Sequence, residues 1–352
     1  MSRFLSSKYD ELVPYVPGEQ PKDRRFIKLN TNESPFPPSP LAVKYAAEAA
    51  RSCQLYSDPE LSSLTDAFCA VYGVSPSSAV FSNGSDDMLN YAFMCFCDGD
   101  HPAAFADITY GLYSVLADLN RVPYTVIPLR DDFTIDVGDY CGTDHTIFIA
   151  NPNAPTGIAL PVIEIERILA TNPNNVVVVD EAYVDFGASS MLKLTEKYDN
   201  LLVVGTFSKS RSLAGARLGY ACASEAIIAD INAIRYSLNP YNVNSMTLAA
   251  GIGSLEDDEY NRANCSVIIE NREYAAEELK KLGFTLTDSK ANFLFARHPD
   301  FSGEQIYSRL REKGILVRHF GSERIKDYNR ITVGTRGEMQ ELIKCLKEII
   351  GQ

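Results

Sequence analysis

The sequence lacks a long apolar segment. No run of about 18 consecutive apolar residues occurs among its 352 residues, which excludes a membrane-spanning helix. Residues 1–10 carry charges throughout and lack the apolar core of a secretory signal. We therefore expect a cytoplasmic protein that has no membrane partner.

Basic residues are also few. Lysine and arginine together number 33 against 46 acidic residues, so the formal net charge is −13 at pH 7 and the pI is about 4.9. A chain this acidic repels nucleic acids and anionic membranes, and we expect neither as a partner. Any phosphate site must then be a local group of arginines that works against the overall charge.

Patterns of metal ligands are absent as well. The eight cysteines are scattered, and the closest two, Cys95 and Cys97, do not form a C-x-x-C pair. The four histidines show no paired spacing of the kind that a helix needs to bind one ion. We predict no metal site and reduced thiols that pack as small apolar side chains.

The sequence does contain alternating strand and helix patterns. A length of 352 residues suggests about two domains of roughly 150 residues each. The β-branched run at 176–179 is typical of a parallel strand that is buried on both faces. From residue 291 to 350, shorter strands and helices alternate and indicate a second, smaller α/β lobe.

Residues 201–220 contain the clearest chemical signal. An apolar strand at 201–204 delivers Ser208 and Lys209 to its end, and Arg217 follows after a turn rich in glycine and alanine. Partial desolvation at this position favours the neutral amine of Lys209, which is a nucleophile. Ser208 and Arg217 together suit one phosphate. A nucleophilic amine beside a phosphate seat is what a pyridoxal phosphate enzyme requires, although a lone lysine after a strand is usually a solvated end charge.

Asp180 follows the apolar run at 176–179, at the end of a strand where ligands bind in open α/β sheets. A carboxylate in this position is desolvated and costly unless a cation pairs with it. A protonated pyridine nitrogen would supply that cation. The sequence thus places a candidate amine and a candidate counter-ion at the ends of two successive strands.

These segments resemble a known family. The string S-K-x-x-x-L-A-G-x-R-x-G-Y at 208–220 resembles the lysine segment of fold-type-I aminotransferases, and D-E-A-Y at 180–183 is a second family pattern. Residues 151–157 resemble N-P-N-N-P-T-G, except that Ala154 replaces an asparagine. The segments P-Y-V-P-G at 14–18 and L-N-T-N-E-S-P at 29–35 look like the start of histidinol-phosphate aminotransferases. The resemblance runs from about Tyr15 to Arg336.

The resemblance implies an α/β fold of the fold-type-I kind. Its large domain holds a mostly parallel seven-stranded sheet flanked by helices, and a smaller α/β domain follows at the C-terminus. We expect an N-terminal arm at 1–35 that packs on the small domain or a partner subunit, a large cofactor-binding domain at 36–240, and a small domain at 241–352.

The resemblance also implies roles for individual residues. Lys209 attaches to the cofactor, pyridoxal 5′-phosphate, and moves the substrate proton, while Asp180 and Tyr183 tune the cofactor ring. Tyr110 lies flat against that ring. The phosphate is held by the following residues and backbone groups: Ser208, Arg217 and the N–H groups of Ser85 and Asp86, with the Asp86 carboxylate pointing away or capping the helix.

Other implied roles concern the substrate and the subunit interface. Arg336, expected at a strand end, and Tyr15 bind the substrate, and Tyr56 reaches across a homodimer interface to the neighbour's cofactor phosphate. Because Ala154 lacks the usual amide, either Asn153 donates to the 3′ oxygen of the cofactor, or Tyr183 and a water share that task. Arg318, His319 and Arg330 are candidates for a second anion site or for structure, and the sequence does not separate these roles.

The implied reaction is the transamination of histidinol phosphate with 2-oxoglutarate, which gives imidazole acetol phosphate and glutamate in histidine biosynthesis. One alternative is another fold-type-I activity, namely an aromatic or aspartate aminotransferase or a phosphothreonine decarboxylase. A second alternative, of a different class, is a non-catalytic binding protein on the same scaffold.

Overall fold

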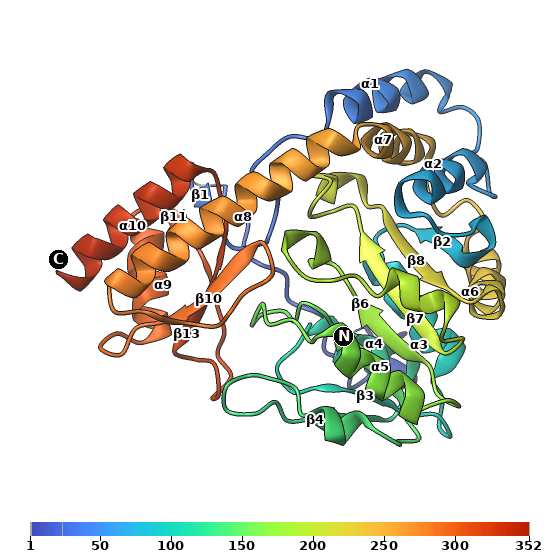
Figure 1. Cartoon of the computed structure of the whole chain (residues 1–352), viewed down its shortest axis with the longest axis horizontal. Helices are drawn as coiled ribbons and strands as arrows, with labels where there is room; N and C mark the ends of the chain where they lie inside the picture. The colour runs from blue at the N-terminus through green and yellow to red at the C-terminus, as the bar shows by residue number, and fades with distance from the viewer. Residues whose placement is uncertain (1, 23, 352) are drawn as a thin grey trace.

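The computed structural model describes residues 2–22 and 24–351, and its largest element is a seven-stranded sheet (Figure 1). The strand order is β2-β8-β7-β6-β5-β3-β4, and only β8 runs antiparallel to its two neighbours. The prediction of a mostly parallel seven-stranded sheet is therefore confirmed. The strands are β2 (Ala79–Ser82), β3 (Ala103–Ala106), β4 (Tyr124–Ile127), β5 (Thr146–Ala150), β6 (Val177–Asp180), β7 (Leu201–Thr206) and β8 (Gly219–Ala223).

Helices cover both faces of this sheet. One face packs on α3 (Ser85–Phe96), α4 (Leu112–Asn120) and α6 (Glu225–Leu238), and the other on α2 (Ser62–Tyr72), α5 (Val162–Thr171) and α7 (Ser245–Glu256). Successive strand residues point to opposite faces, so Val178 belongs to the first core and Val177 and Val179 to the second. This double burial explains why the strands read as continuous apolar runs.

A smaller lobe is built around a four-stranded antiparallel sheet of order β12-β13-β10-β9. Its strands are β9 (Thr285–Leu286), β10 (Phe293–Arg297), β12 (Arg318–His319) and β13 (Tyr328–Thr332), and its helices are α8 (Asp258–Lys281), α9 (Gly303–Glu312) and α10 (Arg336–Ile350). These elements share a core of their own. In Figure 1, α8 runs from the end of α7 toward this lobe.

The helical stretch between the two lobes is divided into α7 and α8 at Asp257, whose backbone leaves the helical region. Helix α7 packs against α1 (Pro40–Ala49) and α2, whereas α8 packs against α10 of the small lobe. The predicted domain limits at 36–240 and 241–352 stay a prediction. On this packing we propose a boundary at the break before α8.

The N-terminal arm lies on the small lobe of its own chain. Strand β1 (Ile27–Lys28) pairs in parallel with β11 (Ile315–Leu316), and Leu29 is buried in the small-lobe core. The guanidinium of Arg318 donates to the carbonyl oxygens of Val16 and Pro17 at 3.3 and 3.4 Å. The arm therefore spans the space between the small lobe and the edge of the large sheet where the strands end.

The last strand is shorter than the sequence pattern indicates. Strand β13 ends at Thr332, and Thr335 forms a capping box with Glu338 that starts α10. Arg336 is thus the first residue of a helix, and the expectation that it lies at a strand end is wrong. Among the described residues, every helix is too short or too polar to span a bilayer.

The core contact between α3 and β5 leads to the first testable prediction. The rings of Phe93 and Phe148 are fully buried and stacked, with centroids 4.2 Å apart. Phe93→Ala leaves a cavity that the surrounding packing fills only in part, so we expect the free energy of unfolding to fall by about 3–5 kcal/mol. Urea unfolding followed by circular dichroism measures the change.

The matched control is Ile163→Ala on α5, where the side chain is mostly exposed. We expect this variant to change the free energy of unfolding by less than about 0.5 kcal/mol. Equal effects of the two substitutions would contradict the assignment of Phe93 to the core.

Candidate active site

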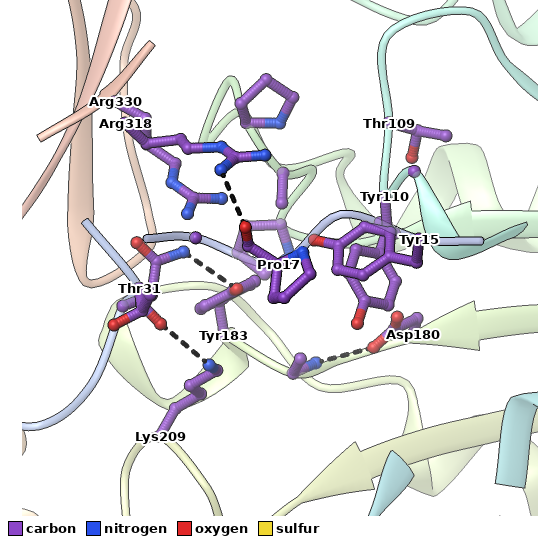
Figure 2. A pocket seen from close by; sticks show the side chains of 18 of the residues that line it. Tyr15, Pro17, Thr31, Thr109, Tyr110, Asp180, Tyr183, Lys209, Arg318 and Arg330 are labelled. Atoms are coloured by element: carbon purple, nitrogen blue, oxygen red, sulfur yellow. Dashed lines mark hydrogen bonds between the residues drawn. The ribbon is translucent and has the colours of Figure 1, made fainter. Parts of the chain in front are cut away.

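A cavity of about 450 Å³ lies where the carboxyl ends of β5, β6 and β7 face the N-terminal arm and the small lobe. Ligands bind at this edge in open α/β sheets. Figure 2 shows Lys209 and Asp180 on one side of the cavity and Arg318 and Arg330 on the other. The predicted site residues that line it are Tyr15, Ser85, Asp86, Tyr110, Asp180, Tyr183, Ser208, Lys209 and Arg217.

One end of the cavity has the features of a phosphate seat. Helix α3 starts after Gly84, which has a φ of +92° and provides no side-chain cap for the first backbone N–H groups. Those N–H groups and the helix dipole favour an anion. A Cβ atom at Gly84 would lie 2.5 Å from Nη2 of Arg217, so the guanidinium occupies the space that only glycine leaves free. Ser208 lines the same cavity. These groups fit a phosphate.

The Asp86 side chain differs from its prediction. Instead of pointing away, its carboxylate accepts hydrogen bonds from Nη2 of Arg217 at 3.0 Å and from the hydroxyl of Tyr110 at 2.9 Å. The physical reason is the nearby guanidinium, whose charge attracts the carboxylate into the cavity. Burial, together with the charge of Asp86, raises the pKa of Tyr110, which therefore remains a hydrogen-bond donor.

Asp180 ends β6 and is only 5% exposed. Burial raises the pKa of its carboxyl group to about 6, although hydrogen bonds from Tyr113 and from the N–H of Ala182 act in the opposite direction. The hydroxyl of Tyr113 donates at 3.0 Å and the N–H of Ala182 at 3.1 Å. Within the described part of the chain, no cation forms an ion pair with Asp180. The site therefore favours a ligand that brings a positive charge to this carboxylate.

Lys209 extends from the loop that follows β7. Its Nζ lies 3.5 Å from the carbonyl oxygen of Thr31 and 5.7 Å from the ring centroid of Tyr183. No carboxylate of the described residues pairs with it at salt-bridge distance. An amine that is not engaged by a counter-ion is available to react with a carbonyl group or to accept a proton.

Tyr183 follows Asp180 closely and brings a phenol to the same cavity. Its hydroxyl accepts a hydrogen bond of 3.0 Å from the amide Nδ2 of Asn32, and its ring meets Phe293 edge-on at 5.1 Å. Asn32 was part of a recognised sequence segment but carried no predicted role. The pairing joins positions far apart in the sequence, so the sequence offered no signal for it.

Arg318 and Arg330 extend into the cavity from β12 and β13 of the small lobe. Nη2 of Arg330 donates to the carbonyl oxygen of Asn30 at 3.0 Å, while its buried Nε has no partner among the described residues. Burial lowers the pKa of Arg330, and neither arginine forms a salt bridge with a described carboxylate. Two cations without counter-ions form a site for an anionic ligand.

Tyr15 and His319 lie near these arginines but differ in position. The ring of Tyr15, on the arm, meets Tyr110 edge-on at 6.0 Å, and burial raises the pKa of Tyr15. His319 pairs with Glu304 at 3.3 Å and does not line the cavity. His319 therefore lies outside the group of residues that Arg318 and Arg330 form at the cavity.

Two predicted residues are not in the cavity. Arg336 is exposed, and its guanidinium lies 4.2 Å from the ring centroid of Tyr274, because the capping box places it on a helix. Asn153 does not line the cavity, and its amide nitrogen donates to the carbonyl oxygen of Ile108 and to Thr156; of the two predicted alternatives, Tyr183 is the residue that lines the cavity. Ala154 itself lines the cavity without a polar side chain.

Tyr56 also lies outside the cavity of its own chain. Its side chain is 82% exposed, and its ring stacks on Tyr241 with centroids 4.4 Å apart. Contact with a neighbour's cofactor therefore stays a prediction. Sequence reasoning missed Tyr113, whose hydroxyl supports Asp180, since a tyrosine within a helix pattern reads as an ordinary core residue.

Comparisons with known proteins agree with this arrangement. Residues 24–346 match the family described as "Aminotransferase class I and II". Histidinol-phosphate aminotransferases from Brachyspira hyodysenteriae and Marinomonas sp. are 46% and 47% identical to the chain. Each match covers 99% of the chain, together with 99% of the Brachyspira protein and 100% of the Marinomonas protein.

A solved structure shares the fold. It is the histidinol-phosphate aminotransferase from Sinorhizobium meliloti in complex with pyridoxal-5′-phosphate, which is 24% identical, with a TM-score of 0.84 and coverage of 93% of this chain and 92% of that one. The sequence identity over the full length, the shared fold and the residues of the cavity therefore support the same family. The chain belongs to the histidinol-phosphate aminotransferases, within the class I and II aminotransferases.

Proposed function

We propose that this protein transfers the amino group of histidinol phosphate to 2-oxoglutarate, forming imidazole acetol phosphate and glutamate in histidine biosynthesis. One observation carries the proposal. A single cavity holds Lys209 without a counter-ion, the buried carboxylate of Asp180, and the unpaired cations of Arg318 and Arg330. A transaminase of a phosphorylated amine needs these three elements together: a reactive amine, an acceptor for a cationic ring, and a second anion seat.

The cofactor is pyridoxal 5′-phosphate, which when bound supplies a ring that withdraws electrons from the carbon bearing the substrate's amino group. Arg217, Ser208 and the first N–H groups of α3 fit its phosphate. Asp180 fits its ring nitrogen, because the buried carboxylate gains a charge partner there. Tyr110 lines the same cavity and would cover one side of the ring.

Lys209 performs the proton transfers. Its Nζ accepts the proton from the substrate carbon and later returns it, acting as general base and then as general acid. The carbonyl oxygen of Thr31, 3.5 Å from Nζ, holds the amine over the ring of Tyr183. Residues of the arm, including Tyr15 and Pro17, line the cavity from the small-lobe side and help to exclude water during these transfers.

The anion seat accounts for the choice of substrate. Histidinol phosphate carries a phosphate and 2-oxoglutarate two carboxylates, and Arg318 and Arg330 can bind either group with forked hydrogen bonds. The contacts from Arg318 to the arm carbonyls are long, at 3.3 and 3.4 Å, so an anion can replace them. This assignment takes the place of the one predicted for Arg336.

The proposal includes assembly and location. We propose a homodimer in which Tyr56 reaches the neighbour's phosphate seat, supported by the exposure of Tyr56 and of Leu55 beside it. A cytoplasmic location is supported by the eight cysteines, which are all free thiols.

The first test of the function compares substrates. We expect a kcat/KM for histidinol phosphate well above those for phenylalanine and aspartate, measured with 2-oxoglutarate as the acceptor, and above that for phosphothreonine, measured by release of carbon dioxide. Lys209→Ala removes the proton-transfer group and should lower kcat by about 10²–10⁴-fold or more and abolish the visible absorption band of the purified protein.

Lys193→Ala, at an exposed lysine, is the control and should leave both the rate and the band unchanged. A preference for phenylalanine or phosphothreonine would refute the assigned substrate. Normal colour with no turnover of any amine would support the non-catalytic alternative instead.

The second test concerns the anion seat. Arg330→Gln removes a half-buried cation that lines the anion seat, so we expect kcat/KM for histidinol phosphate to fall by about 100-fold or more, equivalent to about 3 kcal/mol. Steady-state kinetics measures the loss. Arg336→Gln serves as the matched control and should change kcat/KM by less than about twofold; a large loss there would restore the role first predicted for Arg336.

The third test uses the pKa of Asp180. The folded state raises this pKa from its ordinary value of 3.8 to about 6, so the folded protein binds the proton more tightly than the unfolded chain. The stability from this group is therefore present below about pH 4 and is lost as the pH rises through about 6, with a full loss of roughly 3 kcal/mol.

Asp180→Asn removes this titration. Between pH 5 and pH 8, the cofactor-free wild type should lose about 1–1.5 kcal/mol of unfolding free energy more than the Asn variant, measured by urea unfolding at each pH. If the unfolding free energies of the two proteins changed in parallel with pH, the folded state would not raise the pKa of Asp180, and the prediction would be contradicted.

A further inference from the structure

We propose that Asn32 is a positioning residue, whose amide group fixes the hydroxyl of Tyr183 as an acceptor and thereby directs the Tyr183 proton into the cavity. The inference rests on the proposed function, since it concerns the phenol beside the cofactor ring. Asn32 lies in the N-terminal arm and Tyr183 follows β6 of the large sheet; both line the cavity, and Nδ2 of Asn32 lies 3.0 Å from the hydroxyl of Tyr183.

The local backbone explains why asparagine occupies this position. Asn32 has a φ of +55°, in the left-handed region that most side chains avoid and that asparagine and aspartate tolerate. The residue is 1% exposed. Its buried amide group therefore requires hydrogen-bond partners on both its oxygen and its nitrogen.

In the structure the Asn32 amide group directs its oxygen at Thr332 and its nitrogen at Tyr183. The backbone N–H of Asn32 donates to Oγ1 of Thr332 at 2.9 Å, and the hydroxyl of Thr332 in turn donates to Oδ1 of Asn32 at 3.0 Å. The carbonyl oxygen of Asn32 accepts from Nδ2 of Asn292 at 3.0 Å. With Oδ1 directed at Thr332, the donor Nδ2 must face Tyr183.

This orientation determines the role of the phenol. An amide nitrogen has no lone pair to accept a proton, so the hydroxyl of Tyr183 must be the acceptor in its 3.0 Å contact with Nδ2 of Asn32. Within the described part of the chain, no other group accepts a hydrogen bond from this hydroxyl. Its hydrogen is therefore available to an oxygen atom of the molecule bound in the cavity, such as the oxygen substituent of the cofactor ring.

The residues beside Tyr183 do not replace its hydroxyl as a hydrogen-bond donor to the cavity. Ala154 packs beside Tyr183 and offers no donor, and the amide of Asn153 is engaged by Ile108 and Thr156. On this side of the cavity the donor is thus the hydroxyl of Tyr183, and its direction depends on Asn32. A lost or reversed hydrogen bond at Asn32 removes that donor.

The same contacts connect the two lobes. Thr332 and Asn292 belong to the small lobe, and Thr332 lies on β13 with Arg330, which faces the anion seat. Asn32 therefore joins the strand that holds the substrate anion to the tyrosine that faces the ring. Anchoring through Thr332 keeps Nδ2 directed at Tyr183 when the small lobe is in this position.

The experiment is a double-mutant cycle on Asn32→Asp and Tyr183→Phe. Aspartate keeps the shape, the left-handed backbone and the acceptor for Thr332, but it cannot donate to the phenol. A carboxylate at position 32 would accept the Tyr183 proton and turn it away from the cavity. We expect Asn32→Asp to weaken the affinity for pyridoxal 5′-phosphate by about tenfold, measured by loss of the visible band on dilution of the holoenzyme.

In the Tyr183→Phe background, Asn32→Asp should have no further effect on that affinity, because Asn32 acts through the hydroxyl. The pH midpoint of the visible band should also rise in Asn32→Asp, since a donor to the ring oxygen stabilises the deprotonated form, and this shift should vanish in the same background. Losses that multiply in the double variant would overturn the proposal, because the added charge would then act directly on the cofactor.

Two further variants complete the design. Asn174→Asp, at an exposed position in the turn before β6, adds the same charge and should leave affinity and pH midpoint unchanged. If Asn32→Asp does not fold, Thr332→Val frees the Asn32 amide to rotate and should weaken cofactor binding by a smaller factor, again only when Tyr183 is present. Cofactor affinity is measured without any amine, so a different preferred substrate would refute the proposed function and leave this result unaffected.

Discussion

The structure depends on a carboxylate that is buried at a cost. Asp180 ends a strand whose other residues are fully buried, so its side chain is desolvated, and burial raises its pKa to about 6. Tyr113 and the N–H of Ala182 offset part of this cost with hydrogen bonds. The uncompensated part of the cost favours the binding of a cation, and under the proposed function that cation is a protonated ring nitrogen.

A second uncompensated charge lies across the cavity. Arg330 is half-buried, its buried Nε has no hydrogen-bond partner, and it has no counter-ion among the described residues, so it favours an anion as Asp180 favours a cation. The protein keeps these charges on different lobes, with Lys209 near the floor and the arm between them. A ligand that brings a cationic ring to one side and a phosphate to the other satisfies both, and burial makes each interaction stronger than it is in water.

The positions of site residues within short motifs could be predicted from the sequence. The positions of site residues that depend on contacts between distant segments could not. Lys209 and Asp180 follow apolar strands, and strand direction alone brings them to one edge. The segment at 330–336 contains two arginines, and only the capping box of Thr335 shows that the strand has ended before Arg336. The pairing of Asp86 with Arg217 joins positions 131 residues apart, and no local pattern encodes it.

The N-terminal arm shows why so much of the site escapes local patterns. Its backbone supplies the carbonyl of Thr31 to Lys209 and that of Asn30 to Arg330, so adjacent residues of one extended segment position two cavity side chains that belong to different lobes. Every residue has a backbone carbonyl group, so the side chains at positions 30 and 31 do not reveal which carbonyl groups contact Lys209 and Arg330. The arm reaches that place because β1 pairs with β11 and buries Leu29 in the small lobe, so a short strand helps to set the geometry of the candidate site.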